Sequence, residues 1–180
     1  KYEFYYWFRV KKEAQIIIKD KGYDEGINYL SLKFSKIKNP NVKMVFDIAN
    51  FYKNSKNYEK AIEYYTEIIS SLDDNSEIKS DLLYRRGGSY ERLGNFQKAD
   101  EDLKYSLRIN PDDAYVLNYL AYSWLERKYK IDEAMRMLEK AYALRSNDPY
   151  ITDSIGWAYY LIENYTEAEK YIKKAVELMP

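Results

Sequence analysis

The sequence contains no cysteine and no histidine. Without cysteine, the chain can form no disulfide bond and offers no thiolate to a metal ion or to nucleophilic catalysis. Without histidine, it lacks the side chain that most often acts as a general base near neutral pH, and the commonest nitrogen ligand of metals. These two absences exclude thiolate zinc sites and the common nucleophile–histidine hydrolases.

A net charge is also absent, because 29 Lys and Arg residues balance 29 Asp and Glu residues. Binding to phosphates usually needs a basic excess, so we expect no nucleic-acid partner. The charge is unevenly spread: residues 1–60 carry a surplus of six positive charges (13 against 7), and residues 61–180 a deficit of six (16 against 22). The longest apolar run, Ile16–Ile18, is far below the roughly 18 residues of a membrane span, so we expect no membrane insertion.

Glycine is scarce, and its one adjacent pair, Gly87-Gly88, falls within a predicted helix instead of a phosphate-binding loop. Paired acids such as Glu59 and Glu63 have the spacing of a solvated helix face. The segment Asp73–Glu77 lacks the central glycine and the distal glutamate of a calcium-binding loop. We therefore expect no catalytic residue, no cofactor and no metal, and predict that the protein is not an enzyme.

Tyrosine is abundant, with 22 copies in 180 residues. Many copies belong to a recurring unit, in which a small or polar residue precedes an aromatic residue, polar residues and then Ala or Gly. The unit occurs at Gly22–Gly26, Asn57–Ala61, Asn95–Ala99 and Asn164–Ala168, with spacings of 35, 38 and 69 residues. A variant at Lys130–Ala134 divides the longest spacing. A period in the mid-thirties indicates an array of helical repeats.

Within each period, apolar and small residues lie three or four positions apart, and therefore on one face of each of two helices. The sequence resembles the tetratricopeptide repeat family, whose pattern is Trp-x2-Leu-Gly-x2-Tyr, then Ala-x3-Phe, then Pro. The resemblance covers nearly the whole chain. The copies share small residues where paired helices approach closest: Ala49, Gly87, Ala121 and Gly156 in the first helices, and Ala61, Ala99, Ala134 and Ala168 in the second.

This resemblance implies an all-α fold, a right-handed α-solenoid of about five tetratricopeptide-like helix–turn–helix repeats that form a single domain over residues 1–180. The expected repeats are 7–41, which is degenerate and has Glu13 at an interior position, and 42–79, 80–113, 114–148 and 149–180, the last closing at Pro180. The expected helices lie near 5–20, 24–37, 41–54, 58–71, 77–93, 96–109, 112–127, 131–144, 148–162 and 165–178. Asn110–Asp113 and Asn147–Pro149 are expected to stop one helix and cap the next.

In the family, the first helices of the repeats line a concave groove that holds peptides. The resemblance implies a peptide-binding groove in this chain at Asn50, Arg85, Gly88, Tyr115, Tyr119, Tyr122, Trp157 and Tyr160. Gly88 is expected to leave a notch beside Arg85 for a ligand side chain or carboxylate; the alternative is close helix packing. The aromatic residues are of the types enriched at binding hot spots, and the alternative is that they pack against adjacent helices.

Some family members grip the acidic C-terminal tails of chaperones with a two-carboxylate clamp. In this chain, Lys11, Gln15, Asp47, Asp81 and Arg85 align with the clamp positions. Two of these five are acids, which would repel a carboxylate. We therefore do not expect a chaperone-tail clamp.

We expect a non-enzymatic scaffold or adaptor that binds a protein or peptide partner. The alternative is a structural assembly element that forms a homodimer through its uncapped last repeat, where Ile172 and Val176 are apolar. The segments Leu83–Gly94 and Leu117–Trp124 look like multi-repeat proteins of proteobacteria, many of which are envelope lipoproteins that act as adaptors. This narrower resemblance favours the bacterial periplasm or cell envelope, with the cytoplasm as the alternative. The chain begins at Lys1 and not at Met, so we expect a fragment or a processed form.

Overall fold

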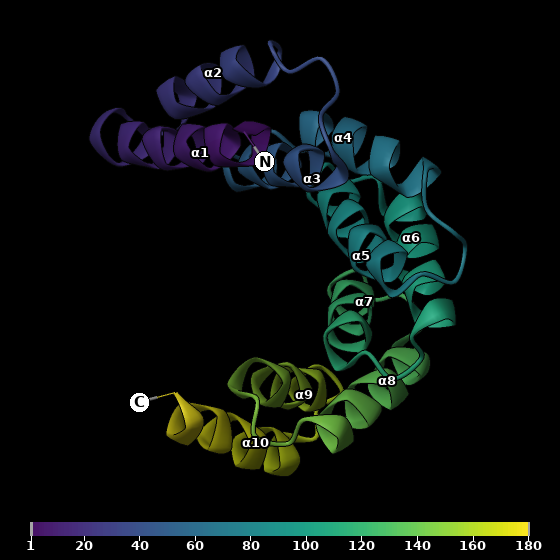
Figure 1. Ribbon diagram of the computed structural model, residues 1–180. Coiled ribbons are helices and arrows are strands. Elements are labelled where there is room, and N and C mark those ends of the chain that lie inside the picture. The colour runs from purple at the N-terminus through teal and green to yellow at the C-terminus, as the bar shows by residue number, and fades with distance from the viewer. Residues whose placement is uncertain (1, 180) are drawn as a thin grey trace. The chain divides into compact units, whose positions relative to one another are not determined.

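A computed structural model describes residues 2–179, with side chains from residue 5 onward. These residues form ten helices and no strand (Figure 1). The helices are α1 (Tyr2–Lys21), α2 (Tyr23–Phe34), α3 (Val42–Asn54), α4 (Tyr58–Ser70), α5 (Glu77–Arg92), α6 (Phe96–Ile109), α7 (Ala114–Glu126), α8 (Ile131–Leu144), α9 (Pro149–Leu161) and α10 (Tyr165–Leu178). The predicted all-α repeat fold is confirmed. Pro180, the predicted end of the last repeat, lies outside the described residues.

The chain is divided into two compact units. The first comprises the residues up to Asp74 together with Arg85–Ala99, and the second comprises Asn75–Tyr84 together with the residues from Asp100 onward. In the first unit α1 packs on α2 and α3 on α4; in the second α7 packs on α8 and α9 on α10. Among residues 2–179, no helix has both the length and the apolar character needed to cross a bilayer.

The turn between the paired helices has the same backbone conformation in four repeats. One residue of each turn is left-handed: Lys56 (φ 63°), Gly94 (φ 74°), Lys128 (φ 53°) and Glu163 (φ 63°). The N–H of the residue after it donates to a carbonyl five residues earlier, from Asn57 to Tyr52, Asn95 to Tyr90, Tyr129 to Trp124 and Asn164 to Tyr159, at 2.8–2.9 Å. This hydrogen bond defines a Schellman motif, which satisfies carbonyls at the end of the first helix.

The same turns also start the second helices. Asn57, Asn95 and Asn164 each accept a hydrogen bond from the backbone N–H three residues later, which is the geometry of an N-cap. In the turn with one extra residue, the N-cap position falls to Lys130, which is left-handed (φ 47°) and makes no side-chain cap. The acid caps predicted for two first helices are confirmed, because Asp113 and Asp148 each accept from two backbone N–H groups.

Small residues lie at the helix contacts, as the sequence predicts. All eight are buried, including Ala49, Ala121 and Ala134, which have no exposed surface. At Gly156 a Cβ atom would lie 2.8 Å from Ile172 Cγ1 and 3.1 Å from the Ile172 backbone nitrogen. Because real Cβ atoms rarely come this near to other atoms, α9 and α10 depend on a glycine to pack as closely as they do.

The first repeat is helical, but its interior differs from the prediction in one respect. Val10, Ala14, Gly26 and Leu30 are buried as expected. Glu13, expected at an interior position, instead keeps 44% of its side chain exposed and accepts a hydrogen bond from the Tyr29 hydroxyl. The expectation for Glu13 was therefore wrong, because the buried stripe of α1 runs through the neighbouring positions.

Candidate peptide-binding surfaces

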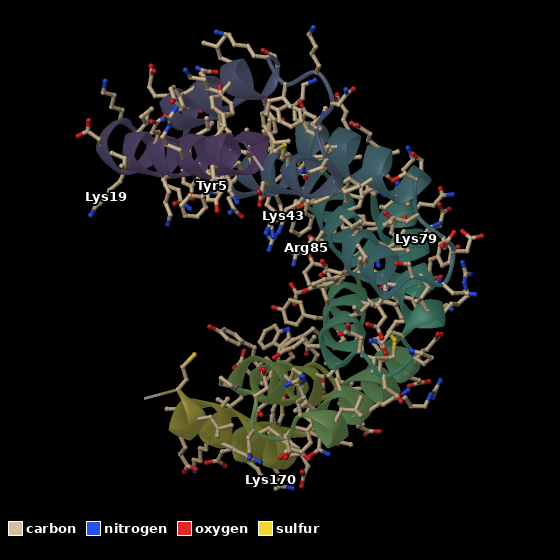
Figure 2. The ribbon with its side chains drawn as sticks, viewed as in Figure 1. Tyr5, Lys19, Lys43, Lys79, Arg85 and Lys170 are labelled. Atoms are coloured by element: carbon tan, nitrogen blue, oxygen red, sulfur yellow. The ribbon has the colours of Figure 1, made fainter. Side chains whose placement is uncertain are left out.

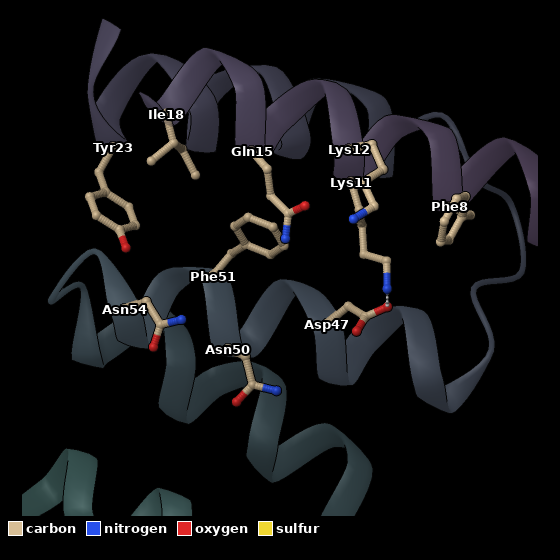
Figure 3. A pocket seen from close by; sticks show the side chains of 10 residues that line it. All are labelled: Phe8, Lys11, Lys12, Gln15, Ile18, Tyr23, Asp47, Asn50, Phe51 and Asn54. Atoms are coloured by element: carbon tan, nitrogen blue, oxygen red, sulfur yellow. Dashed lines mark ion pairs between the residues drawn. The ribbon is translucent and has the colours of Figure 1, made fainter. Parts of the chain in front are cut away.

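The first unit contains a pocket of about 370 Å³ on one side of α1 and α3 (Figure 3). Ten residues line it: Phe8, Lys11, Lys12, Gln15 and Ile18 of α1, Tyr23 of α2, and Asp47, Asn50, Phe51 and Asn54 of α3. The α1 residues recur at intervals of three or four, so they project from one helix face. The same reasoning applies to the α3 residues, and the two faces meet across the pocket.

The pocket is rich in groups that can hydrogen-bond a peptide backbone. Gln15, Asn50 and Asn54 supply three side-chain amides, each with a donor and an acceptor. Lys11 Nζ lies 2.7 Å from Asp47 Oδ2, and Trp7 Nε1 donates to the same carboxylate oxygen at 3.0 Å. Because Lys11 balances the carboxylate, the remaining cation, Lys12, leaves the pocket with a positive surplus.

Asn50 is held in one orientation by its neighbours. Its Oδ1 accepts a hydrogen bond from the hydroxyl of Tyr65, a fully buried side chain, at 2.8 Å. It also accepts from Arg85 Nη1 at 3.5 Å. With the oxygen engaged in this way, the amide N–H groups are what Asn50 can offer to a ligand.

Arg85 and Gly88 both lie on α5. The Arg85 guanidinium lies 5.2 Å from the centre of the Phe46 ring, a cation–π distance. Figure 2 shows Arg85 and Lys43 projecting from the ribbon in the same direction. The structure thus brings the predicted residues Asn50 and Arg85 together. Gly88 is half-buried, and the ligand notch predicted beside it stays a prediction.

The second unit holds the five predicted aromatic residues, on α7 and α9. Tyr115, Tyr122 and Tyr160 are exposed, and Trp157 is half-buried. Trp157 stacks on Tyr160 with ring centres 5.3 Å apart. Tyr119 differs, since it packs against the hydrophobic core and meets Tyr84 edge-on at 5.7 Å. Of the two readings left open by the sequence, internal packing therefore describes Tyr119, while Tyr115, Tyr122 and Tyr160 each expose between 40% and 49% of their surface.

Two carboxylates accompany these rings. Trp157 Nε1 on α9 donates a hydrogen bond to Glu126 Oε1 on α7 at 2.8 Å. Burial raises the pKa of the Tyr122 phenol, and the nearby charges of Glu126 and Asp153 raise this pKa further. Tyr122 is therefore close to two negative charges carried by two different helices.

Sequence reasoning missed several residues of the pocket in the first unit. Phe8, Lys12 and Tyr23 belong to the degenerate first repeat, where the consensus is too weak to assign groove positions. A signal was nonetheless present, because Lys11 and Gln15 of α1 align with ligand-binding positions of the family.

Repeated helix pairs, small residues at the helix contacts and a recurring Schellman turn define a helical-repeat protein. Protein-family models described as "Tetratricopeptide repeat" match the sequence at residues 42–71, 80–113 and 154–180. The chain belongs to the tetratricopeptide repeat family. This fold supports a protein-interaction scaffold, and members of the family are typically non-enzymatic.

Two curated relatives share the repeats. The chain is 26% identical to TPR repeat-containing protein PA4667 of Pseudomonas aeruginosa over 169 residues, which cover 94% of this chain and 28% of that protein. It is 39% identical to TPR repeat-containing protein MJ1428 of Methanocaldococcus jannaschii over 80 residues, 43% of this chain and 14% of that protein. The chain thus spans less than a third of either relative.

Solved structures show the same fold. One is MamA from Desulfovibrio magneticus RS-1, with a TM-score of 0.71 at 16% sequence identity, covering 96% of this chain and 94% of that chain. At this level of identity, the similarity concerns the fold alone.

Proposed function

We propose that the chain is a non-enzymatic scaffold or adaptor that holds an extended segment of a partner protein against the exposed faces of its odd-numbered helices. The observation that carries this proposal is the pocket on α1 and α3, where three amides and two lysines face an open volume of about 370 Å³. Amides at regular helical spacing suit a peptide backbone, whose N–H and C=O groups alternate along the chain.

In this proposal, each unit binds the partner through its own residues. The first unit contributes Asn50, Arg85 and Gly88 beside the pocket, and the second contributes exposed rings. Tyr and Trp give large contact areas at low entropic cost, which is why they dominate binding hot spots. The rings proposed to contact the partner are Tyr115, Tyr122, Trp157 and Tyr160.

A peptide selection tests this function. Random peptides displayed on phage are selected on the whole chain, and the affinity of each selected peptide is then measured by fluorescence anisotropy. Replacing Tyr122 or Trp157 with Ala should weaken binding by about 2 kcal/mol or more each if these rings are hot spots, and Asn50→Ala should weaken binding by about 1 kcal/mol.

Leu144→Ala serves as the control, because Leu144 is exposed on α8, an even-numbered helix. Circular dichroism confirms that every variant remains folded. Selected peptides that bind all the groove variants as tightly as the unaltered chain would place the binding site elsewhere and contradict the proposal.

A second candidate is assembly into a homodimer through α10, and one comparison favours it. Ile172 of α10 is 37% exposed, whereas Leu138, at the corresponding position of α8, is fully buried. Val176 is exposed, whereas Tyr142, its counterpart on α8, is half-buried. The difference arises because α9 packs on α8, and within the described residues no helix follows α10.

Light scattering tests the assembly candidate. A dimer formed through this face should give a mass that rises with concentration, and Val176→Lys should return it to that of one chain. A mass equal to one chain at every concentration would eliminate this candidate.

A further inference from the structure

Helices α7 and α9 have an unusual charge composition. Between them they carry two charged side chains, Glu126 on α7 and Asp153 on α9, and neither helix contains a lysine or an arginine. The first cation after α7 is Arg127, which is bound to Asp100 at 2.7 Å. In contrast, α1 and α3 of the first unit carry several lysines.

The two acids lie beside Tyr122, which is exposed, and Trp157, which is half-buried. Tyr122 and Glu126 are four residues apart on α7, and Asp153 and Trp157 are four residues apart on α9, so each pair shares one helix face. The hydrogen bond from Trp157 Nε1 to Glu126 joins the two pairs at 2.8 Å. We call these four residues the acidic aromatic cluster.

The chemistry of this cluster suits a cation. Aromatic faces attract a guanidinium or ammonium group, and nearby carboxylates add charge attraction. An acidic ligand would meet two uncompensated carboxylates, because the indole that binds Glu126 is neutral. Arginine gains most from such a site, since its planar group can both stack on a ring and donate to a carboxylate.

The chain itself provides an example of this arrangement at one end of α7. The guanidinium carbon of Arg145 lies 5.1 Å from the centre of the Tyr115 ring. The hydroxyl of the same tyrosine donates to Asp148 Oδ2 at 3.1 Å. A tyrosine ring whose hydroxyl is bound to a carboxylate thus already accommodates an arginine beside the first turn of α7.

We propose that the acidic aromatic cluster binds an arginine or lysine side chain of the partner segment, with arginine preferred. This inference rests on the proposed peptide-binding function and names the chemistry of one contact in it. The partner is therefore a basic segment where it crosses α7 and α9.

The test measures binding of dye-labelled peptides to the whole chain by fluorescence anisotropy. The first peptide carries three arginines separated by Gly and Ser. Two matched peptides carry citrulline, which has nearly the shape of arginine without its charge, or glutamate. The arginine peptide should bind about ten-fold more tightly than the citrulline peptide, and the glutamate peptide most weakly.

Paired variants locate the effect. The double variant Glu126→Gln and Asp153→Asn removes both charges with little change in shape, and Gln can still accept the Trp157 hydrogen bond. It should weaken binding of the arginine peptide about ten-fold and leave the citrulline peptide unchanged. The matched control is Asp132→Asn with Glu177→Gln, which removes two charges from exposed positions on α8 and α10. This control should change the affinity less than two-fold, about 0.4 kcal/mol.

The outcomes separate this inference from the function on which it rests. Equal affinity for the arginine and citrulline peptides overturns the cation preference but leaves peptide binding intact. An equal loss in both double variants also overturns it, because the attraction would then be due to overall charge. If none of the three peptides binds, the inference is wrong, and the phage-selected peptides show independently whether the chain binds peptides at all.

Discussion

One residue of the turn between paired helices is left-handed in four repeats. Substitutions at this position should change the stability of the protein in opposite directions in two of these repeats. Gly94 occupies this position in one repeat, and Lys56 occupies it in another. A left-handed conformation costs an L-residue about 1–2 kcal/mol, whereas glycine adopts it readily. Gly94→Ala should therefore destabilise the protein, and Lys56→Gly should stabilise it.

The structure allows both magnitudes to be estimated. A Cβ atom at Gly94 would meet no other atom within 4 Å, so the alanine variant adds backbone strain without a steric clash. Alanine also lowers the entropy of the unfolded chain, which returns about 0.4–1 kcal/mol. The net loss of stability for Gly94→Ala is then about 1 kcal/mol. The same two effects with reversed signs give a gain of about 0.5–1 kcal/mol for Lys56→Gly.

Guanidinium unfolding followed by circular dichroism measures both changes, provided that the slope of each transition stays constant. Gly94→Asn is the matched control, because asparagine tolerates the left-handed region better than alanine and should lose less stability. An alanine variant as stable as the unaltered protein would refute the reasoning. Equal losses for Ala and Asn would show that something other than the backbone angle matters at this turn.

Three further predictions concern stability and ionisation. Tyr65→Phe should cost about 1 kcal/mol in guanidinium unfolding, because it removes the buried hydroxyl that donates to Asn50. Leu138→Ala should cost about 2–5 kcal/mol in the same assay, since this side chain is fully buried. The hydrogen bond to Glu13 raises the pKa of Tyr29 from 10.0 to about 12. The stabilisation that this hydrogen bond gives the folded protein should therefore be complete below pH 10 and disappear as the pH rises toward 12. Carbon-13 NMR of labelled tyrosine should show the Tyr29 pKa falling toward 10 in Glu13→Gln, and an unchanged value would contradict this cause.

Much of the fold was predictable because local signals and the repeat period agree. Asp113 and Asp148 stand where a cap is needed, so the starts of α7 and α9 were correct to within two residues. Gly156 and the buried alanines were placed at helix contacts because only small residues fit there. The variant unit at Lys130–Ala134 has Ile131 where the other units have an aromatic residue, and the structure shows that its turn is also irregular, with Lys130 left-handed.

The candidate sites were less predictable, because the sequence pattern does not show how each side chain packs. Tyr119 and Tyr122 are both groove tyrosines by spacing, but only Tyr119 packs against the core. The pairing of Lys11 with Asp47 joins two repeats, and no rule within one repeat predicts it. Whether Glu13 is buried depends on which face of α1 packs against the neighbouring helices. The degenerate consensus of the first repeat does not define that face.

The absence of basic residues from α7 and α9 also has a practical consequence. Trypsin cleaves after lysine and arginine, and no such residue occurs between Arg108 and Arg127 or between Arg145 and Lys170. Each of these helices is therefore released intact within a single tryptic peptide. In a covalent footprinting experiment, a partner bound to α7 and α9 would reduce the labelling of two tryptic peptides, one for each helix.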